Sequence, residues 1–249
     1  CFKRTAAKDL WKKMLKMLFE TSSPWITFKD PSNIRYSDQH EGTVFSSNLC
    51  TEIIRHSKST SYEPNNDRKI KEYGETAVCN LGSFNLANHV DEHGNIDYAK
   101  LATTIEVGFR MLDNVIDINF YPTQEAKKSN KRHRPVGMGS MGWADLFLKK
   151  KLSYDSDEAI QLSDELYEFI SYHSILASSK LAKERGAYES YEGSLWSKGI
   201  FPIDTYNDLM INYRDSVASN EKLDWSEVRE HVKKYGIRCK VLFINIKLI

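Results

Sequence analysis

The feature that most constrains this chain is a long run of helical periodicity in its C-terminal half. Between residues 155 and 186, apolar side chains recur every three or four positions, the spacing of one face of an α-helix. The run opens on a capping pattern at residues 155–158 and closes on Gly186, a residue type common at helix ends. The spacing predicts one helix of about eight turns.

Other segments show the same spacing. Residues 5–20, 97–119 and 224–236 are predicted to be helices, and a shorter helical pattern ends at Lys150. Residues 76–86 are mostly small or apolar, which predicts a strand buried on both faces with Cys79 inside. Residues 25–54 are predicted to form strands and ordered loops, and residues 55–75 an exposed excursion without a functional role. An α/β fold with a helix-rich C-terminal half is therefore expected.

Charge and cysteine usage exclude several classes of protein. Lys and Arg total 35 against 34 acidic residues, a formal net charge of +1, so the chain lacks the basic surplus expected of a nucleic-acid-binding protein. No apolar run is long enough to span a bilayer and no signal peptide is evident, so a cytoplasmic protein is expected. Cys1, Cys50, Cys79 and Cys239 form no Cys-x-x-Cys pair, and no histidine has metal-site spacing, so no metal site is expected.

Residues 48–52 carry the sharpest cluster of reactive groups. If this segment is extended, Asn48, Cys50 and Glu52 point to one face, which brings an amide, a thiol and a carboxylate together. A carboxylate can act as a base, an amide can orient a hydroxyl, and a thiol can act as a nucleophile or hydrogen abstractor. By spacing alone, a buried cysteine in a polar loop is the commoner interpretation.

Two other patterns have simpler explanations. Gly137, Gly139 and Gly142 fit Gly-x-Gly-x-x-Gly, but a basic stretch and not a predicted strand precedes them, which argues against a dinucleotide site. His133 lies among Lys131, Arg132 and Arg134. Phosphate binding is one interpretation of that stretch, and a charged solvated turn or domain contact is the commoner one.

The motif Ser-Ser-Asn-Leu-Cys-Thr-Glu-Ile at residues 46–53 resembles the active-site loop of class I ribonucleotide reductase large subunits. Further stretches resemble the same family in the same order, at residues 75–86, 111–122, 129–142, 181–199 and 234–238. Together they are far more specific than one short pattern. The resemblance implies an internal fragment that contributes part of a ten-stranded α/β barrel, with residues 1–238 as a partial catalytic barrel domain. The finger loop of that barrel would fall at about residues 46–53.

The resemblance also implies roles for four residues. Cys50 would be the thiyl radical that removes the 3′ hydrogen of a ribonucleoside diphosphate, and Glu52 would be the base toward the 3′ hydroxyl. Asn48 would hydrogen-bond the substrate hydroxyls. Cys79 would be one of two thiols that reduce the substrate, the other lying upstream of this chain in the family.

Cofactors and partners follow from the same resemblance. The chain itself would bind no cofactor; the radical would come from a metal-containing small subunit, and ATP or dNTP effectors would bind segments missing here. Thioredoxin or glutaredoxin would be the reductant, and other large-subunit fragments would complete the barrel. Residues 239–249 depart from the family pattern and form a β-prone tail. Because the resemblance places the second reducing cysteine and the substrate-phosphate loop outside this chain, the isolated chain is expected to be inactive. The alternatives are a non-catalytic remnant that binds a partner, and a relative of the cobalamin-dependent reductases.

Overall fold

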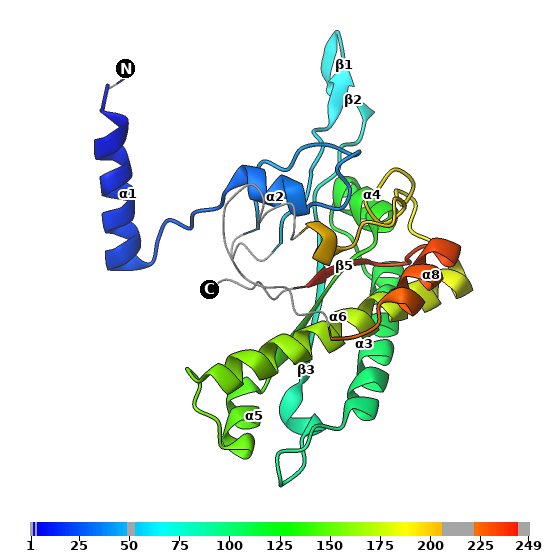
Figure 1. Ribbon diagram of the computed structural model, residues 1–249. Coiled ribbons are helices and arrows are strands. Elements are labelled where there is room, and N and C mark those ends of the chain that lie inside the picture. Colours follow the sequence, from blue (N-terminus) through cyan, green and yellow to red (C-terminus); the bar gives the residue numbers. More distant parts are fainter. Residues whose placement is uncertain (1, 3, 49–52, 206–221, 244–249) are drawn as a thin grey trace.

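A parallel β-sheet with helical crossovers forms the centre of the molecule (Figure 1). The fold comes from a computed structural model that describes residues 2, 4–48, 53–205 and 222–243. The sheet order is β3-β4-β5, made of Asn80–Asn85, Pro135–Met141 and Lys240–Phe243, and both pairings are parallel. The connecting helices are α3 (Tyr98–Ile118), α4 (Gln124–His133), α5 (Trp143–Lys150), α6 (Asp157–Arg185) and α8 (Ser226–Tyr235). This arrangement confirms the predicted α/β class.

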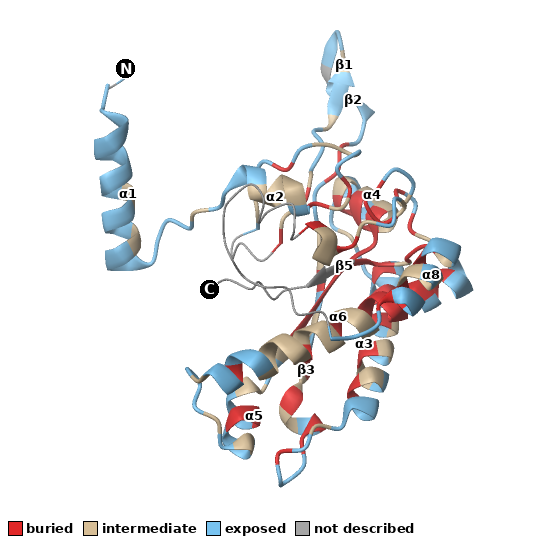
Figure 2. Ribbon diagram, viewed as in Figure 1, coloured by how far each residue is buried: buried red, intermediate tan, exposed pale blue. Residues whose placement is uncertain are grey.

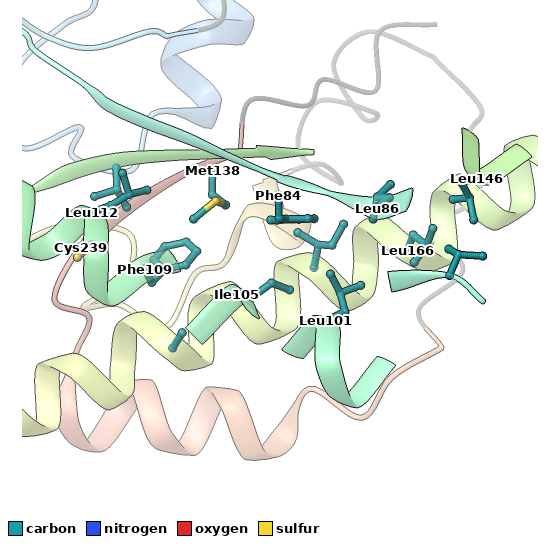
Figure 3. Packing of buried hydrophobic residues seen from close by; sticks show 14 of the residues in the cluster. Phe84, Leu86, Leu101, Ile105, Phe109, Leu112, Met138, Leu146, Leu166 and Cys239 are labelled. Atoms are coloured by element: carbon teal, nitrogen blue, oxygen red, sulfur yellow. The ribbon is translucent and has the colours of Figure 1, made fainter. Parts of the chain in front are cut away.

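The main apolar core lies between the sheet and helices α3 and α6 (Figure 3). Ile105 and Phe109 of α3 pack here with Phe84 of β3, Met138 of β4 and Leu166 of α6. A second core joins the C-terminal half of α6 to α8 and the segment between them; it includes Ile175, Trp196, Phe201, Val228 and Val232. The apolar stripes that predicted these helices are the surfaces that they bury.

Helices α3, α6 and α8 begin and end close to their predicted bounds. At the start of α6, the Ser156 side chain accepts a hydrogen bond from the Ala159 N–H. Gly186 ends the helix with a positive φ of 82°, which explains why glycine stands there. At the start of α8, Trp225 occupies the N-cap and makes no side-chain capping hydrogen bond.

Helix α1 (Ala7–Thr21) confirms the prediction for residues 5–20, but it contributes nothing to the core. No residue of α1 is buried, and the helix stands apart from the sheet (Figures 1 and 2). Its apolar residues Leu10, Trp11 and Leu15 are exposed.

The prediction of strands and loops for residues 25–54 was wrong at α2 (Lys29–Arg35). Asp30 and Pro31 suggest a turn in the sequence, but both lie in the first turn of this helix. Proline is tolerated there because its missing N–H would have no intrahelical partner, and an acidic residue is favourable near a helix N-terminus.

The excursion at residues 55–75 is only partly exposed. Its centre is an antiparallel hairpin of β1 (Ser61–Glu63) and β2 (Asn66–Glu72), which projects from the molecule as predicted (Figures 1 and 2). Its two ends contradict the prediction, because Arg55 and Glu75 are buried. Both make long-range contacts with residues that no local pattern identifies.

Strand β3 is shorter and less buried than predicted. Its side chains alternate, with Asn80 and Phe84 buried and Leu81 half exposed at 51%. Cys79, predicted to lie inside, is only partly buried. Among the described residues, β3 is also an edge strand, paired only to β4.

The glycine pattern of residues 137–142 falls on strand β4 and on the residue that follows it. Gly137 and Gly139 are paired with β3, so they are sheet residues and not a phosphate-binding turn. Gly142 follows the strand with φ of 81°, and a Cβ there would lie 2.2 Å from Asn85 Oδ1. Lys240–Phe243, within the predicted tail, pairs with β4 as β5.

Among the described residues, no helix combines the length and apolar character needed to cross a bilayer.

Candidate active site

The loop that carries the Asn-x-Cys-x-Glu motif is closed at its base by Asn48 and Ile53. The Asn48 N–H donates to the Ile53 carbonyl at 3.1 Å, and the Ile53 N–H donates to Asn48 Oδ1 at 3.0 Å. Ser47 and Ile54 form an antiparallel bridge just outside this pair. Cys50 and Glu52 lie outside the described residues.

A pocket of about 520 Å³ brings the base of this loop to the segment that precedes β3. Asn48 and Cys79 both line the pocket, as predicted site residues from separate parts of the chain. Its other lining residues are Ser46, Ser47, Ile53, Arg55, Ser57, Lys58, Ser59, Glu75, Thr76, Ala77, Val78 and Leu81. Asn48 is exposed and Cys79 is partly buried, so the pocket is open to solvent on this chain.

Arg55 forms part of the pocket beside Cys79. Its Nη1 donates to the Val78 carbonyl at 2.9 Å, one residue before Cys79, and the Arg55 side chain is almost completely buried. Burial lowers the pKa of Arg55, but an arginine keeps its charge in proteins. A positive charge is therefore fixed next to the backbone of Cys79.

A buried ion pair lies behind the pocket. Lys240 Nζ donates to Asp38 Oδ2 at 2.9 Å, and the Tyr188 hydroxyl donates to Asp38 Oδ1 at 2.8 Å. Lys240 Nζ also lies 4.0 Å from the centre of the Tyr36 ring. Burial lowers the pKa of Lys240 to about 8, although Asp38 favours its charged form. Neither Asp38 nor Lys240 was identified from the sequence, because their pairing depends on tertiary contact alone.

His133 occupies a second buried network. Its Nε2 lies 2.6 Å from Glu75 Oε2 and its Nδ1 lies 2.6 Å from the Ser190 hydroxyl. Arg132 also donates to Glu75 at 3.1 Å. The interpretation of His133 as part of a solvated turn was wrong, because α4 directs it into the interior.

Burial lowers the pKa of His133 despite its contact with Glu75, so the neutral ring is favoured. A carboxylate can only accept a hydrogen bond, which places the His133 proton on Nε2 and makes Ser190 the donor to Nδ1. Burial by itself raises the pKa of Glu75, but hydrogen bonds from His133 and Arg132 outweigh it and lower that pKa. The buried carboxylate therefore stays charged.

Acid should destabilise the fold through His133. Its folded pKa lies below the unfolded value of 6.5, so its stabilising contribution is present above pH 6.5 and is lost as the pH falls toward the folded pKa. One proton changes the free energy of unfolding by at most about 1.4 kcal/mol per pH unit. Urea unfolding between pH 7 and pH 5 should therefore give a shallower pH slope for His133→Gln than for the unmodified chain. Exposed His93→Gln is the control; equal slopes for all three proteins would contradict the neutral assignment.

Asp113 of α3 organises the framework below the site. It is completely buried and accepts hydrogen bonds from Arg134 at 2.5 Å and from Arg185 at 2.6 Å. Arg238 and the Cys239 thiol each lie 3.3 Å from Asp113 Oδ1. Arg134 precedes β4, Arg185 ends α6, and Arg238 and Cys239 lead into β5, so one carboxylate connects α3 to three other elements.

Across the described parts of the chain, no group of three or more His, Cys, Asp or Glu side chains is placed to hold a metal ion.

Comparison with known proteins gives one family. The family model described as "Ribonucleotide reductase, barrel domain" matches residues 2–244, which includes β5. "Ribonucleoside-diphosphate reductase subunit alpha" of Chlamydia trachomatis serovar D is 50% identical over 248 residues, which are 98% of this chain and 22% of that protein. The "large chain" of Neurospora crassa is 39% identical, over 96% of this chain and 24% of that protein. The "large subunit" of Caenorhabditis elegans is 37% identical, over 96% of this chain and 28% of that protein. The chain thus spans 22–28% of the length of these relatives.

Proposed function

This chain belongs to the ribonucleotide reductase barrel-domain family, and on that premise we propose that it carries the radical and reducing cysteines of a ribonucleoside-diphosphate reductase large subunit. One observation supports this assignment above the others. Asn48, at the base of the Asn-x-Cys-x-Glu loop, and Cys79 line the same pocket, which supports a shared role for the two segments. Relatives named ribonucleoside-diphosphate reductase cover almost the whole chain.

Asn48 is suited to orient a substrate hydroxyl. Its Oδ1 is held by the Ile53 N–H, which fixes the plane of the amide. Among the described residues its Nδ2 has no hydrogen-bond partner, and the side chain is exposed in the pocket. An amide held in this way can donate to a ribose oxygen without first breaking an internal bond.

The proposed reaction uses two cysteines of this chain differently. Cys50, as a thiyl radical, takes the 3′ hydrogen of the ribonucleoside diphosphate, while Glu52 accepts the proton of the 3′ hydroxyl. The 2′ hydroxyl then takes up a proton from the reducing thiol pair and leaves as water. Cys79 and a second thiol outside this chain supply two electrons and become a disulfide, and Cys50 returns the hydrogen to C3′.

The remaining requirements belong to partners. A metal-containing small subunit supplies the radical, and thioredoxin or glutaredoxin reduces the disulfide. The chain spans 22–28% of the length of the relatives named above. We propose that the rest of the barrel, supplied by the remaining length, covers the pocket. Excluding water and oxidants protects a thiyl radical from side reactions.

The proposal predicts that activity depends on the missing segments. The isolated chain, mixed with a small subunit, CDP and thioredoxin, should form no dCDP. Adding polypeptides that supply the rest of the large subunit should restore dCDP formation, and Cys50→Ser should abolish it again. Robust activity of the isolated chain would overturn its proposed incompleteness, and activity of the Cys50→Ser protein would overturn the assignment of the radical site.

A further inference from the structure

Arg55 is a buried cation whose charge is not balanced by an ion pair in the described parts of the chain. Its side chain is only 5% exposed, and its Nε is buried without a hydrogen-bond partner among those residues. The one hydrogen bond of its guanidinium that joins it to the pocket wall goes to a neutral carbonyl, that of Val78. An unbalanced buried charge is destabilising by several kcal/mol, so a nearby negative charge is expected to compensate it.

The charged groups around Arg55 are already engaged with one another. Asp38 faces Arg55 but is held by Lys240 and Tyr188, and Glu75 faces it but is held by Arg132 and His133. The Tyr36 hydroxyl also faces Arg55 and stays neutral, because burial raises its pKa well above the ordinary value. His133 is neutral as well, for the reason given above.

Among the described residues that interact with Arg55, Cys79 is the remaining group that can become negative. It lines the same pocket as Arg55 and interacts electrostatically with both Arg55 and Lys240. A nearby cation favours the thiolate over the thiol, as it does for reactive cysteines generally. We propose that Arg55 is a positioning residue whose charge keeps the Cys79 side chain in its thiolate form.

The step involved is an ionisation and not a redox reaction. The Cys79 S–H bond breaks, its proton passes to water at the open pocket, and the electron pair stays on sulfur beside the guanidinium. Arg55 contributes through two contacts, since its bond to the Val78 carbonyl also fixes the backbone that carries Cys79.

A consequence for turnover rests on the proposed function. Consider an external dithiol that reduces a disulfide between Cys79 and a partner cysteine. The thiolate of the dithiol attacks the sulfur of the partner cysteine, and the S–S bond to Cys79 breaks. The electron pair of that bond leaves on the Cys79 sulfur. A thiol of low pKa is the better leaving group, so Arg55 would direct the reductant to the partner cysteine.

The test is the pH dependence of alkylation at Cys79 by iodoacetamide in the 249-residue chain, read by proteolysis and mass spectrometry. In the unmodified chain the apparent pKa of Cys79 should lie below the value of about 8.5 for a free cysteine. Arg55→Leu should raise it by about one unit, which slows alkylation at neutral pH about tenfold. Arg55→Lys, which restores a charge, should recover most of the rate.

Two controls define the comparison. Arg68→Leu removes an exposed arginine from the distant hairpin and should leave the profile of Cys79 unchanged. Cys239 is a reference within each sample; burial raises its pKa well above the ordinary value, so it should react slowly throughout. Because Lys240 has a pKa of about 8 and loses its charge in the same range, profiles are compared between variants and not in isolation.

Two results would overturn the proposal: an apparent pKa of Cys79 at or above about 8.5 in the unmodified chain, or an unchanged profile in an Arg55→Leu protein that circular dichroism shows to be folded. If Arg55→Leu does not fold, the measurement on the unmodified chain and on Arg55→Lys still decides. Alkylation needs no substrate or partner, so its outcome is separate from that of the reductase assay. If the completed large subunit formed no dCDP while Arg55→Leu still raised the apparent pKa of Cys79, that result would count against the proposed function alone.

Discussion

Replacing Asp113 with alanine should destabilise the chain by about 3–5 kcal/mol, because it removes a buried carboxylate from the buried Arg134 and from the more exposed Arg185 and Arg238. Asp113 is completely buried and accepts from Arg134 and Arg185, with Arg238 also within ion-pair distance. Arg134 then keeps only the exposed Asp117 as a carboxylate partner among the described residues, so its buried charge is less well compensated. Few single substitutions in this chain should have a larger effect on stability.

Urea unfolding followed by circular dichroism measures this loss, and Asp117→Ala is the matched control. Asp117 contacts Arg134 from the same helix but its side chain is 44% exposed, so its removal should change the free energy of unfolding by no more than about 1 kcal/mol. Equal losses for the two variants would contradict the role assigned to Asp113.

The same carboxylate predicts the direction of acid sensitivity. Burial by itself raises the pKa of Asp113, but the hydrogen bonds and charges of Arg134 and Arg185 outweigh it and lower the pKa below 3.8. Its stabilising contribution is therefore present above pH 3.8 and is lost as the pH falls through the folded pKa. The loss through Asp113 begins below pH 3.8 and the loss through His133 begins below pH 6.5, so the effect of His133 starts first as the pH falls.

Helices with a clear apolar stripe could be predicted from the sequence. Helices α3 and α6 bury the residues that their periodicity identified, such as Ile105 and Leu166, because a stripe must pack against a core. Helix α2 could not, since Asp30 and Pro31 are equally typical of a turn and of a helix N-terminus. Local signals of this kind leave the choice to tertiary packing.

The candidate site divides in the same way. Asn48 and Cys79 were identified from motifs, and the structure places both on one pocket. Arg55, Glu75 and Lys240 were missed because charged residues in polar or β-prone segments look exposed when their partners are far along the chain. A buried pair such as Asp38 and Lys240 leaves no periodic signal in either segment.

Under the proposed function, replacing Cys79 with serine should abolish deoxynucleotide formation by a large subunit assembled from this chain and the missing segments. This is the largest functional effect expected of any described residue. Serine preserves the shape of the side chain, but its hydroxyl cannot form a disulfide or supply the two electrons. The matched control is Cys239→Ser, because Cys239 is buried beside Asp113 and does not line the pocket. That variant should retain activity.

A single-turnover reaction tests the proposed function most directly. A large subunit assembled from this chain and polypeptides that supply the rest of the barrel is reduced beforehand, freed of external dithiol, and mixed with a small subunit and CDP. We predict that dCDP forms in an amount limited by the cysteines present, that Cys79 is recovered in a disulfide, and that the Cys79→Ser protein forms none. Formation of dCDP with Cys79 still alkylatable as a thiol, or by the Cys79→Ser protein, would contradict its assignment as a reducing cysteine.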